Sequence, residues 1–177
     1  MAEDTPNPDT AAPDAAAADP AQAPQFAIVG QYIKDLSFEN PNAPASMVGG
    51  AQPGSNVNIN VHVKKQADDV YAVELGLNVK TEREGSVLYA LELVYGGLFR
   101  TKNIPENQLS ALLMVEGPRL IFPFARQVLA TTIQAGGFAP LMLEPVDFLA
   151  LFRRNLAAAA EKQKTAAANG DAPVTVN

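Results

Sequence analysis

Hydrophobic and polar residues alternate along three stretches in the first half of the chain, which is the pattern of strands that bury one face. In the clearest stretch, residues 57–63, valine and isoleucine occupy every second position, and asparagine and histidine lie between them. Residues 71–79 and 87–99 repeat this period of two, and Glu84-Gly85 between them indicates a tight turn. These three stretches therefore predict consecutive antiparallel strands.

An earlier strand is predicted over residues 26–38, where large apolar residues alternate with other residues near both ends. The interruption between the two ends leaves open whether this is one long strand or a broken one. The prolines and glycines of residues 44–54 make the following segment longer than a tight hairpin loop. We therefore expect a crossover, after which the second strand need not neighbour the first.

The second half of the chain carries apolar residues at helical spacing and the start and stop signals of three helices. The first is predicted to start at Asn103, with a proline in its first turn and Glu106 completing a capping box. The second is predicted to start near Pro123 and to end at Gly136-Gly137. The third is predicted to begin near Pro145. Four strands followed by helices indicate an α+β fold.

The two ends of the chain differ in composition from the part between them. Residues 1–24 are mainly alanine, proline and aspartate, with too little large apolar surface to offset the entropy of ordering, so we expect a disordered tail. Residues 157–177 are expected to begin as an alanine-rich helical extension and to end in a flexible tail. A single domain is expected over residues 25–156, a length typical of one domain.

Composition and charge argue against several classes of function. The 177 residues include 19 acidic and 13 basic side chains, giving a net charge of −6 and a pI near 4.7, so no nucleic-acid partner is expected. The absence of cysteine rules out disulfides and thiolate metal sites and fits a reducing cytoplasm. Without a signal peptide or a run of about 20 apolar residues, we expect a cytoplasmic protein with no membrane insertion.

Side chains suited to catalysis or metal binding are few. The single histidine, His62, lies in a predicted strand without neighbours suited to a triad, and one imidazole with scattered carboxylates does not make a zinc site. Turn chemistry explains the pair Asp68-Asp69. Asp35 and Glu39 would share an acidic patch, although an ordinary solvated face is the simpler interpretation. We expect no enzymatic activity, no metal site and no cofactor.

The apolar residues exceed what one sheet with its helices can bury. Leu88, Ala90 and Val94 make the second face of the last predicted strand nearly as apolar as the first. The helix predicted after Pro123 also has apolar residues on more than one face. Ordinary core packing explains any one of these residues, but the whole set indicates association into an oligomer.

Several strings of residues resemble those of one bacterial family. They are YIKDLSFENPNAP (32–44), ADDVY (67–71), GGLF (96–99), LIFPFAR (120–126), GF (137–138) and PVDFLALF (145–152). In these strings the chain resembles the SecB family of preprotein chaperones. The resemblance covers about residues 26–156 and leaves both tails outside it.

The resemblance implies both a fold and a function. It implies a four-stranded antiparallel sheet with helices packed on one face, which pairs edge to edge into dimers. Two dimers would stack through their long helices as a homotetramer, a dimer of dimers. It also implies a chaperone that holds unfolded preproteins without ATP and delivers them to SecA, the motor of the Sec translocon. No bound cofactor is implied.

The resemblance also assigns two surfaces by residue. Grooves beside the crossover and the last helix would hold unfolded clients through apolar and flexible side chains. The matching positions here are Phe38, Met47, Val57, Ile59, Met142, Phe148 and Phe152. Acidic positions on the exposed sheet face would contact SecA, and the matching residues are Asp35, Glu39 and Glu92. Because Ala90 stands where the family pattern has a larger aliphatic residue, we expect the apolar part of that contact to be weaker.

Two other interpretations stay open. A structural or small-ligand-binding α+β oligomer would use the same apolar surfaces as interfaces only, and it would not bind unfolded peptides. An enzyme has only the unpaired carboxylates in its favour.

Overall fold

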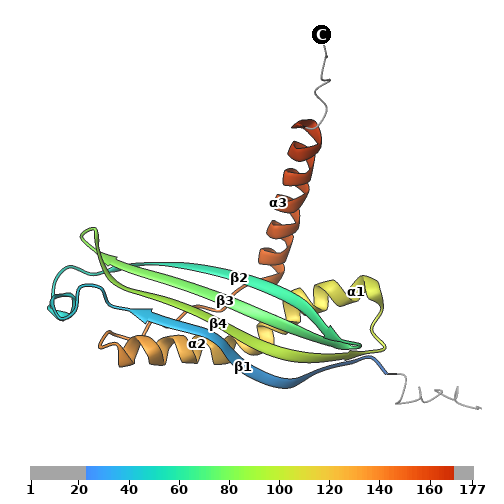
Figure 1. Cartoon of the computed structure of the whole chain (residues 1–177), viewed down its shortest axis with the longest axis horizontal. Coiled ribbons are helices and arrows are strands. Elements are labelled where there is room, and N and C mark those ends of the chain that lie inside the picture. Colours follow the sequence, from blue (N-terminus) through green and yellow to red (C-terminus); the bar gives the residue numbers. More distant parts are fainter. Residues whose placement is uncertain (1–22, 170–177) are drawn as a thin grey trace, which may run out of the picture.

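Four antiparallel strands form one sheet in the order β1-β4-β3-β2, and the long helix α2 (Gly117–Ala135) packs on one side of it (Figure 1). The computed structural model describes residues 23–169, so the predicted tail over residues 1–24 lies almost wholly outside the described residues. The edge strands are β1 (Gln25–Glu39) and β2 (Gly54–Ala67), and the central strands are β3 (Val70–Arg83) and β4 (Ser86–Lys102). This arrangement confirms the predicted α+β fold and its crossover.

Both hairpins turn where the sequence indicates. In the β3–β4 turn, Glu84 and Gly85 have φ angles of 50° and 79°. A two-residue loop with both φ angles positive matches the right-handed twist of the strands it joins, and glycine adopts such an angle without steric cost. In the β2–β3 turn Asp69 has a φ angle of 57°, which aspartate tolerates better than most residues.

The crossover from β1 to β2 is held against the β3–β4 hairpin by side-chain hydrogen bonds. The Asn42 amide donates to the Val87 carbonyl oxygen at 2.9 Å, and Arg83 Nη1 donates to the Val48 carbonyl oxygen at 2.7 Å. Between these two anchors lies a short 3-10 turn, η1 (Ala45–Met47). The crossover thus has a fixed place at one end of the sheet.

One face of the sheet buries the apolar side chains that alternate along β3 and β4. The core residues that are at most 1% exposed include Val73, Leu75, Leu77, Leu91, Leu93 and Phe99 from the sheet and Ile121, Leu129 and Ile133 from α2 (Gly117–Ala135). Burial of this apolar surface, at about 25 cal/mol per Å², is the main force holding α2 on the sheet. The opposite face is called the open face here and carries Asn60, Glu74, Asn78 and Glu92.

Strand β1 is continuous, but two bulges interrupt its pairing with β4. The register shifts after Ile28 and again after Ile33. An extra residue in one strand changes which of its side chains share a face. At the second bulge the consecutive residues Lys34 and Asp35 therefore both line a hollow on the open face. The sequence left open whether this segment is one long strand or a broken one, and the structure shows one long strand with two bulges.

The helical layer is more continuous than the sequence predicts. Helix α1 (Glu106–Ala111) leads through a π-helical turn, η2 (Leu112–Glu116), directly into α2. The predicted capping box at Asn103 is wrong, because Pro105 is the N-cap residue and no side chain caps the helix.

The predicted start of the long helix near Pro123 is also wrong. Helix α2 starts at Gly117, Pro118 is the proline of its first turn, and Pro123 lies inside the helix. Gly117 brings the helix close to β3, since a Cβ at this position would stand 3.0 Å from Val73 Cγ2. The predicted end is correct, because Gly136 is the C-cap residue.

The last helix, α3 (Phe148–Asn169), starts three residues later than the predicted start near Pro145. Asp147 fixes this start, because its Oδ1 atom accepts a hydrogen bond from the Ala150 backbone N–H at 2.9 Å. From there α3 projects away from the sheet (Figure 1). The end of the predicted C-terminal tail, residues 170–177, lies outside the described residues. Over residues 23–169 no helix is long and apolar enough to cross a membrane.

Candidate functional site

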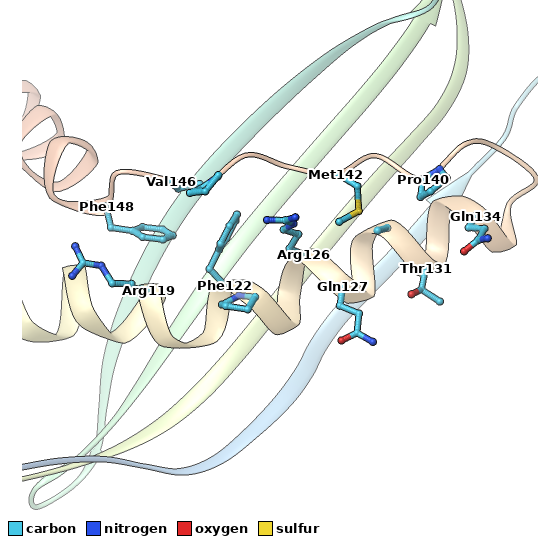
Figure 2. Close-up of a pocket in the computed structure, with 13 residues that line it drawn as sticks. Arg119, Phe122, Arg126, Gln127, Thr131, Gln134, Pro140, Met142, Val146 and Phe148 are labelled. Carbon is cyan, nitrogen blue, oxygen red and sulfur yellow. The ribbon is translucent and has the colours of Figure 1, made fainter.

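A groove of about 720 Å³ runs between α2 and the segment that connects it to α3 (Figure 2). We call it the α2 groove. Its apolar lining consists of Phe122, Pro123, Ala130, Pro140, Met142, Pro145, Val146 and Phe148. Its polar lining consists of Arg119, Arg126, Gln127, Thr131 and Gln134. Proline lacks a backbone N–H and fixes φ near −65°, so the connecting segment is suited to an extended path along the helix.

Two aromatic rings form the deepest part of the α2 groove. The rings of Phe122 and Phe148 pack edge to face, with centroids 5.8 Å apart and an interplanar angle of 72°. Such a pair contributes about 0.5–1.5 kcal/mol beyond the burial of its area. Phe148 is only 1% exposed, whereas Met142 at the rim is 57% exposed. The groove therefore combines a rigid aromatic floor with a flexible thioether at its entrance.

Both cations in the α2 groove come from α2. Arg119 Nη1 lies 2.7 Å from Glu116 Oε1, in an exposed pair of the kind that contributes little to stability. Within residues 23–169 no ion pair joins Arg126 to a carboxylate, and its side chain points toward the connecting segment (Figure 2). An occupant of the groove thus meets apolar surface together with an available guanidinium group.

A second cleft, of about 470 Å³, lies between β2 and the start of α3. Val57 and Ile59 of β2 line one side, and Leu151 and Arg154 of α3 line the other. Val146 lines this cleft and the α2 groove alike, so the two hollows are neighbours. An extended polypeptide bound along α2 could therefore continue from the α2 groove into the cleft beside β2.

A third apolar cluster joins the crossover to the end of α2. The rings of Phe38, Tyr89 and Phe138 contact one another, with centroids 5.7 Å apart for Phe38 and Tyr89 and 4.8 Å apart for Tyr89 and Phe138. Met47 is 54% exposed, and its Cε atom lies where a Cβ at position 137 would be. The glycines after α2 thus let the crossover pack directly on the helix end.

The open face of the sheet carries the predicted acidic residues. In the ladder between β1 and β4, Asp35 pairs with Val94, Ser37 with Glu92, and Glu39 with Ala90. Because side chains alternate between faces, these pairs put all three carboxylates on the open face. Asp35 and Glu92 line one shallow hollow there, whereas Glu39 lies beyond it.

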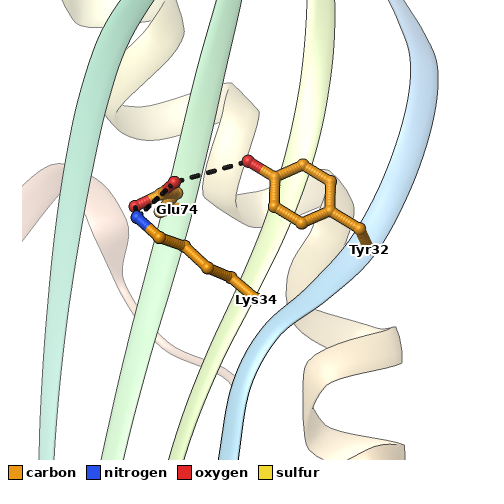
Figure 3. A network of polar contacts seen from close by, with 3 residues as sticks. All are labelled: Tyr32, Lys34 and Glu74. Carbon is orange, nitrogen blue, oxygen red and sulfur yellow. Dashed lines mark hydrogen bonds and ion pairs between the residues drawn. The ribbon is translucent and has the colours of Figure 1, made fainter.

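Beside these acids lies a polar network of Tyr32, Lys34 and Glu74 (Figure 3). Lys34 Nζ donates to Glu74 Oε2 at 2.7 Å, and the Tyr32 hydroxyl donates to Glu74 Oε1 at 3.4 Å. Burial raises the pKa of Tyr32 and the charge of Glu74 raises it further, while the hydrogen bond that Lys34 donates to Glu74 raises the pKa of Lys34. The ring of Tyr32 lies over Gly96, where a side chain would overlap it. Lys34 thus neutralises one carboxylate of the open face.

Side chains that could bind a metal ion do not gather in the part of the chain that the structure describes. Over residues 23–169 no group of three or more His, Asp or Glu side chains is arranged to hold a metal ion. His62 lines the hollow on the open face and pairs with Glu74 across β2 and β3. Its surroundings are those of a surface residue on a strand.

The model of the family described as preprotein translocase subunit SecB matches residues 19–159. This range includes the sheet, the α2 groove and the first half of α3. The chain belongs to the SecB family.

Curated relatives agree with this assignment over most of their length. A protein-export protein SecB of Rhodopseudomonas palustris is 50% identical over 152 residues, which are 85% of this chain and 90% of the relative. The SecB protein of a Bradyrhizobium species is 48% identical, over 85% of this chain and 90% of the relative. The SecB protein of Afipia carboxidovorans is 49% identical, over 84% of this chain and 93% of the relative. The resemblance read from the sequence is therefore confirmed.

A solved SecB-like chaperone of Mycobacterium tuberculosis, in complex with a ChAD peptide from an antitoxin, has the same fold. The two chains superpose with a TM-score of 0.58 and share 14% identity, and the match covers 68% of this chain and 90% of that one. This similarity supports the SecB-like fold.

Six of the seven residues that the SecB resemblance assigned to client binding lie in three places. Met142 and Phe148 lie in the α2 groove, Val57 and Ile59 in the cleft beside α3, and Phe38 and Met47 in the crossover cluster. Phe152 is half-buried against the core and lines neither hollow. The assignment missed Phe122, Pro123 and Arg126, although the string LIFPFAR contains all three.

Proposed function

We propose that this protein is a chaperone of preprotein export, which binds nonnative preproteins without ATP and delivers them to SecA. The observation that carries the proposal is the α2 groove, an apolar groove of about 720 Å³ in a member of the SecB family. Family membership supports the export pathway, and the groove supports the binding of unfolded chain. The same pathway supports a cytoplasmic location.

The chemistry of the α2 groove suits a client without a fixed sequence. An unfolded chain offers apolar side chains and extended backbone, and Met142 is flexible enough to pack against different shapes. The neighbouring cleft at Val57 and Ile59 takes further side chains of the same client. Several weak contacts then add by avidity, which holds an unfolded segment while a folded protein offers no such segment.

Two exposed apolar surfaces support assembly as a homotetramer. Edge strand β1 exposes 45% of Val29, 49% of Ile33 and 40% of Leu36, and an exposed apolar edge strand favours pairing with a second strand. Helix α2 exposes 45% of Leu120 and 47% of Phe124, on another side of the helix from Arg126. We propose that β1 edges form the dimer and that the α2 surfaces stack two dimers.

We propose that SecA docks on the open face at Asp35, Glu39 and Glu92. All three carboxylates are solvent-exposed, and a basic segment of the motor is the chemistry they fit. Ala90 lies among them and offers little apolar surface, so charge would carry most of this contact.

Light scattering with and without an unfolded preprotein tests the proposal. A tetramer of about four 18.7 kDa chains that retains the unfolded client but not its folded form is the expected result. The variant Met142→Ser should bind the client more weakly, whereas the control Val48→Ser, at a residue 69% exposed outside both hollows, should not. A protein that is indifferent to unfolded chains would instead be a structural oligomer.

A further inference from the structure

The net charge of this protein lies in its two terminal segments, outside residues 23–169. Five of the 19 acidic residues belong to residues 1–22, namely Glu3, Asp4, Asp9, Asp14 and Asp19, and no basic residue accompanies them. One more, Asp171, lies in residues 170–177. These six carboxylates account for the whole net charge of −6, so residues 23–169 are neutral. The first 22 residues are thus an anionic segment attached to a body of zero net charge.

We propose that residues 1–22 bind in the α2 groove of their own chain as an internal competitor of clients. The groove presents the apolar surface and the guanidinium groups that an acidic, alanine- and proline-rich segment complements. The occupant is this one segment, and its binding depends on the charge of its five acids.

The composition of the segment matches the lining of the groove. Besides the five acids, residues 1–22 contain eight alanines and four prolines, whose side chains are small and apolar. Proline-rich segments dock in grooves lined by aromatic rings, here those of Phe122 and Phe148. The acids would meet Arg126, which has no carboxylate partner in an ion pair within residues 23–169, and Arg119, whose ion pair with Glu116 is exposed.

Residues 1–22 join the described part of the chain close enough to the α2 groove to reach it. Ala23 accepts a hydrogen bond through its carbonyl oxygen from Asn103 Nδ2 at 3.4 Å, at the end of the sheet where the path into α1 and α2 begins. Twenty-two extended residues span up to about 70 Å. The 19 residues of α2 span about 28 Å. The segment is therefore long enough to lie along the whole groove.

Binding of residues 1–22 in the α2 groove would be weak and would weaken further as salt is added. Alanine and proline bury less apolar area than the large side chains of an unfolded client, so a client displaces the segment. Exposed charge pairs are screened as ionic strength rises, because the Debye length falls from about 10 Å at 0.1 M to about 3 Å at 1 M salt. That the segment competes with clients rests on the proposed function, whereas its docking does not.

Methionine methyl NMR on the full chain tests the docking. Met142 lines the groove and Met47 does not, and their exposures of 57% and 54% make Met47 a matched control. Because the chain has no cysteine, Ala11→Cys carries a single nitroxide label. At low salt the label should broaden the Met142 methyl signal at least twofold more than that of Met47. The preference should vanish in 0.5 M salt, with Arg126→Gln, and when the five acids are replaced by Asn or Gln.

Equal broadening of the two methyl groups, or none, would overturn the docking proposal. So would a Met142 effect that persists when the five acids are neutralised, because charge would not then drive the contact. A sample in which nitroxide and methyl labels are on different chains assigns the occupant. If the Met142 signal broadens as much in this mixed sample as in the sample with both labels on one chain, the segment binds another copy. The proposal that it binds its own chain would then be wrong.

Client affinity separates this proposal from the proposed function. With the five acids neutralised, the dissociation constant for an unfolded preprotein at low salt should fall at least threefold, and in 0.5 M salt it should equal that of the unchanged chain. If Met142 reports docking while client affinity stays the same, docking stands, and the assignment of clients to the α2 groove is wrong. If neither Met142 nor client affinity changes, the docking proposal itself fails.

Discussion

The ring of Phe38, near the end of β1, lies directly over the backbone of Gly136, which ends α2. A Cβ at position 136 would overlap the ring, so only glycine permits this contact. Phe38 also stacks on Tyr89 and meets Phe138. The contact therefore joins an edge strand, a central strand and the end of the long helix.

Gly136→Ala should destabilise the protein by about 1–3 kcal/mol, because the added methyl group forces the Phe38 ring or the helix end to move. Denaturant unfolding at one fixed protein concentration measures this. Gly54→Ala is the matched control, since nothing lies within 4 Å of a Cβ there, and it should change stability little. Equal losses of stability for the two substitutions would show that the contact with Phe38 is not the reason why position 136 needs glycine.

Phe148→Ala should lower the free energy of unfolding by about 3–5 kcal/mol, because it removes a ring that is 1% exposed and leaves a cavity beneath the α2 groove. Met142→Ala should change stability by less than about 0.5 kcal/mol, since its side chain is largely exposed. Both should weaken binding of an unfolded client. If Met142→Ala binds an unfolded client as tightly as the unchanged chain does, the rim of the α2 groove is not part of the client-binding site.

Glu74→Gln should lower the pKa of the Tyr32 hydroxyl, since the negative charge of Glu74 raises it in the native protein. Ultraviolet titration of tyrosinate measures this shift among the four tyrosines. Because the folded pKa values of Tyr32 and Lys34 are raised, their contribution to stability is full below about pH 10 and is lost as the pH rises through the folded values. Glu74→Gln should therefore flatten the loss of stability above pH 10. A tyrosine titration identical in both proteins would contradict the network.

Glu92→Gln should weaken binding of SecA by about two- to fivefold at low salt, because each exposed charge pair contributes modestly. Asp68→Asn is the control, since that exposed carboxylate lies in the β2–β3 turn and pairs with Lys65. Titration calorimetry at two salt concentrations measures both variants. Equal losses for the two variants would mean that net charge alone, and not the open face, governs the contact.

If the proposed β1 edge contact forms the dimer, Ile33→Lys should reduce the mass of the assembly, because it puts a charge into that contact. Light scattering over a dilution series measures the mass. Lys102→Glu changes an exposed charge at the end of β4, opposite Gln25 and far along the strand from Ile33, and should leave the mass unchanged. An unchanged assembly in Ile33→Lys would exclude the β1 edge from the dimer contact.

The strands could be predicted because their signal is local. Over residues 57–63 of β2 and 71–79 of β3, the large apolar residues face the helices and the residues between them face away, so a period of two indicates both the strand and its buried face. The helix starts could not be predicted in the same way. Pro118 and Pro123 are both acceptable in a first turn by local rules, and only the packing of Gly117 against Val73 shows which one begins α2.

The sequence by itself determined the strands, their turns, the end of α2 and, through strings such as YIKDLSFENPNAP, the family. These properties depend on neighbouring residues, which the chain order keeps together. Only the tertiary structure decided that Met142 and Phe148 share a groove with Arg126, and that Lys34 neutralises Glu74 across 40 residues of chain. Such contacts follow from the register of bulged β1 and from the path of the connecting segment along α2. Both are set by packing between elements far apart in the sequence.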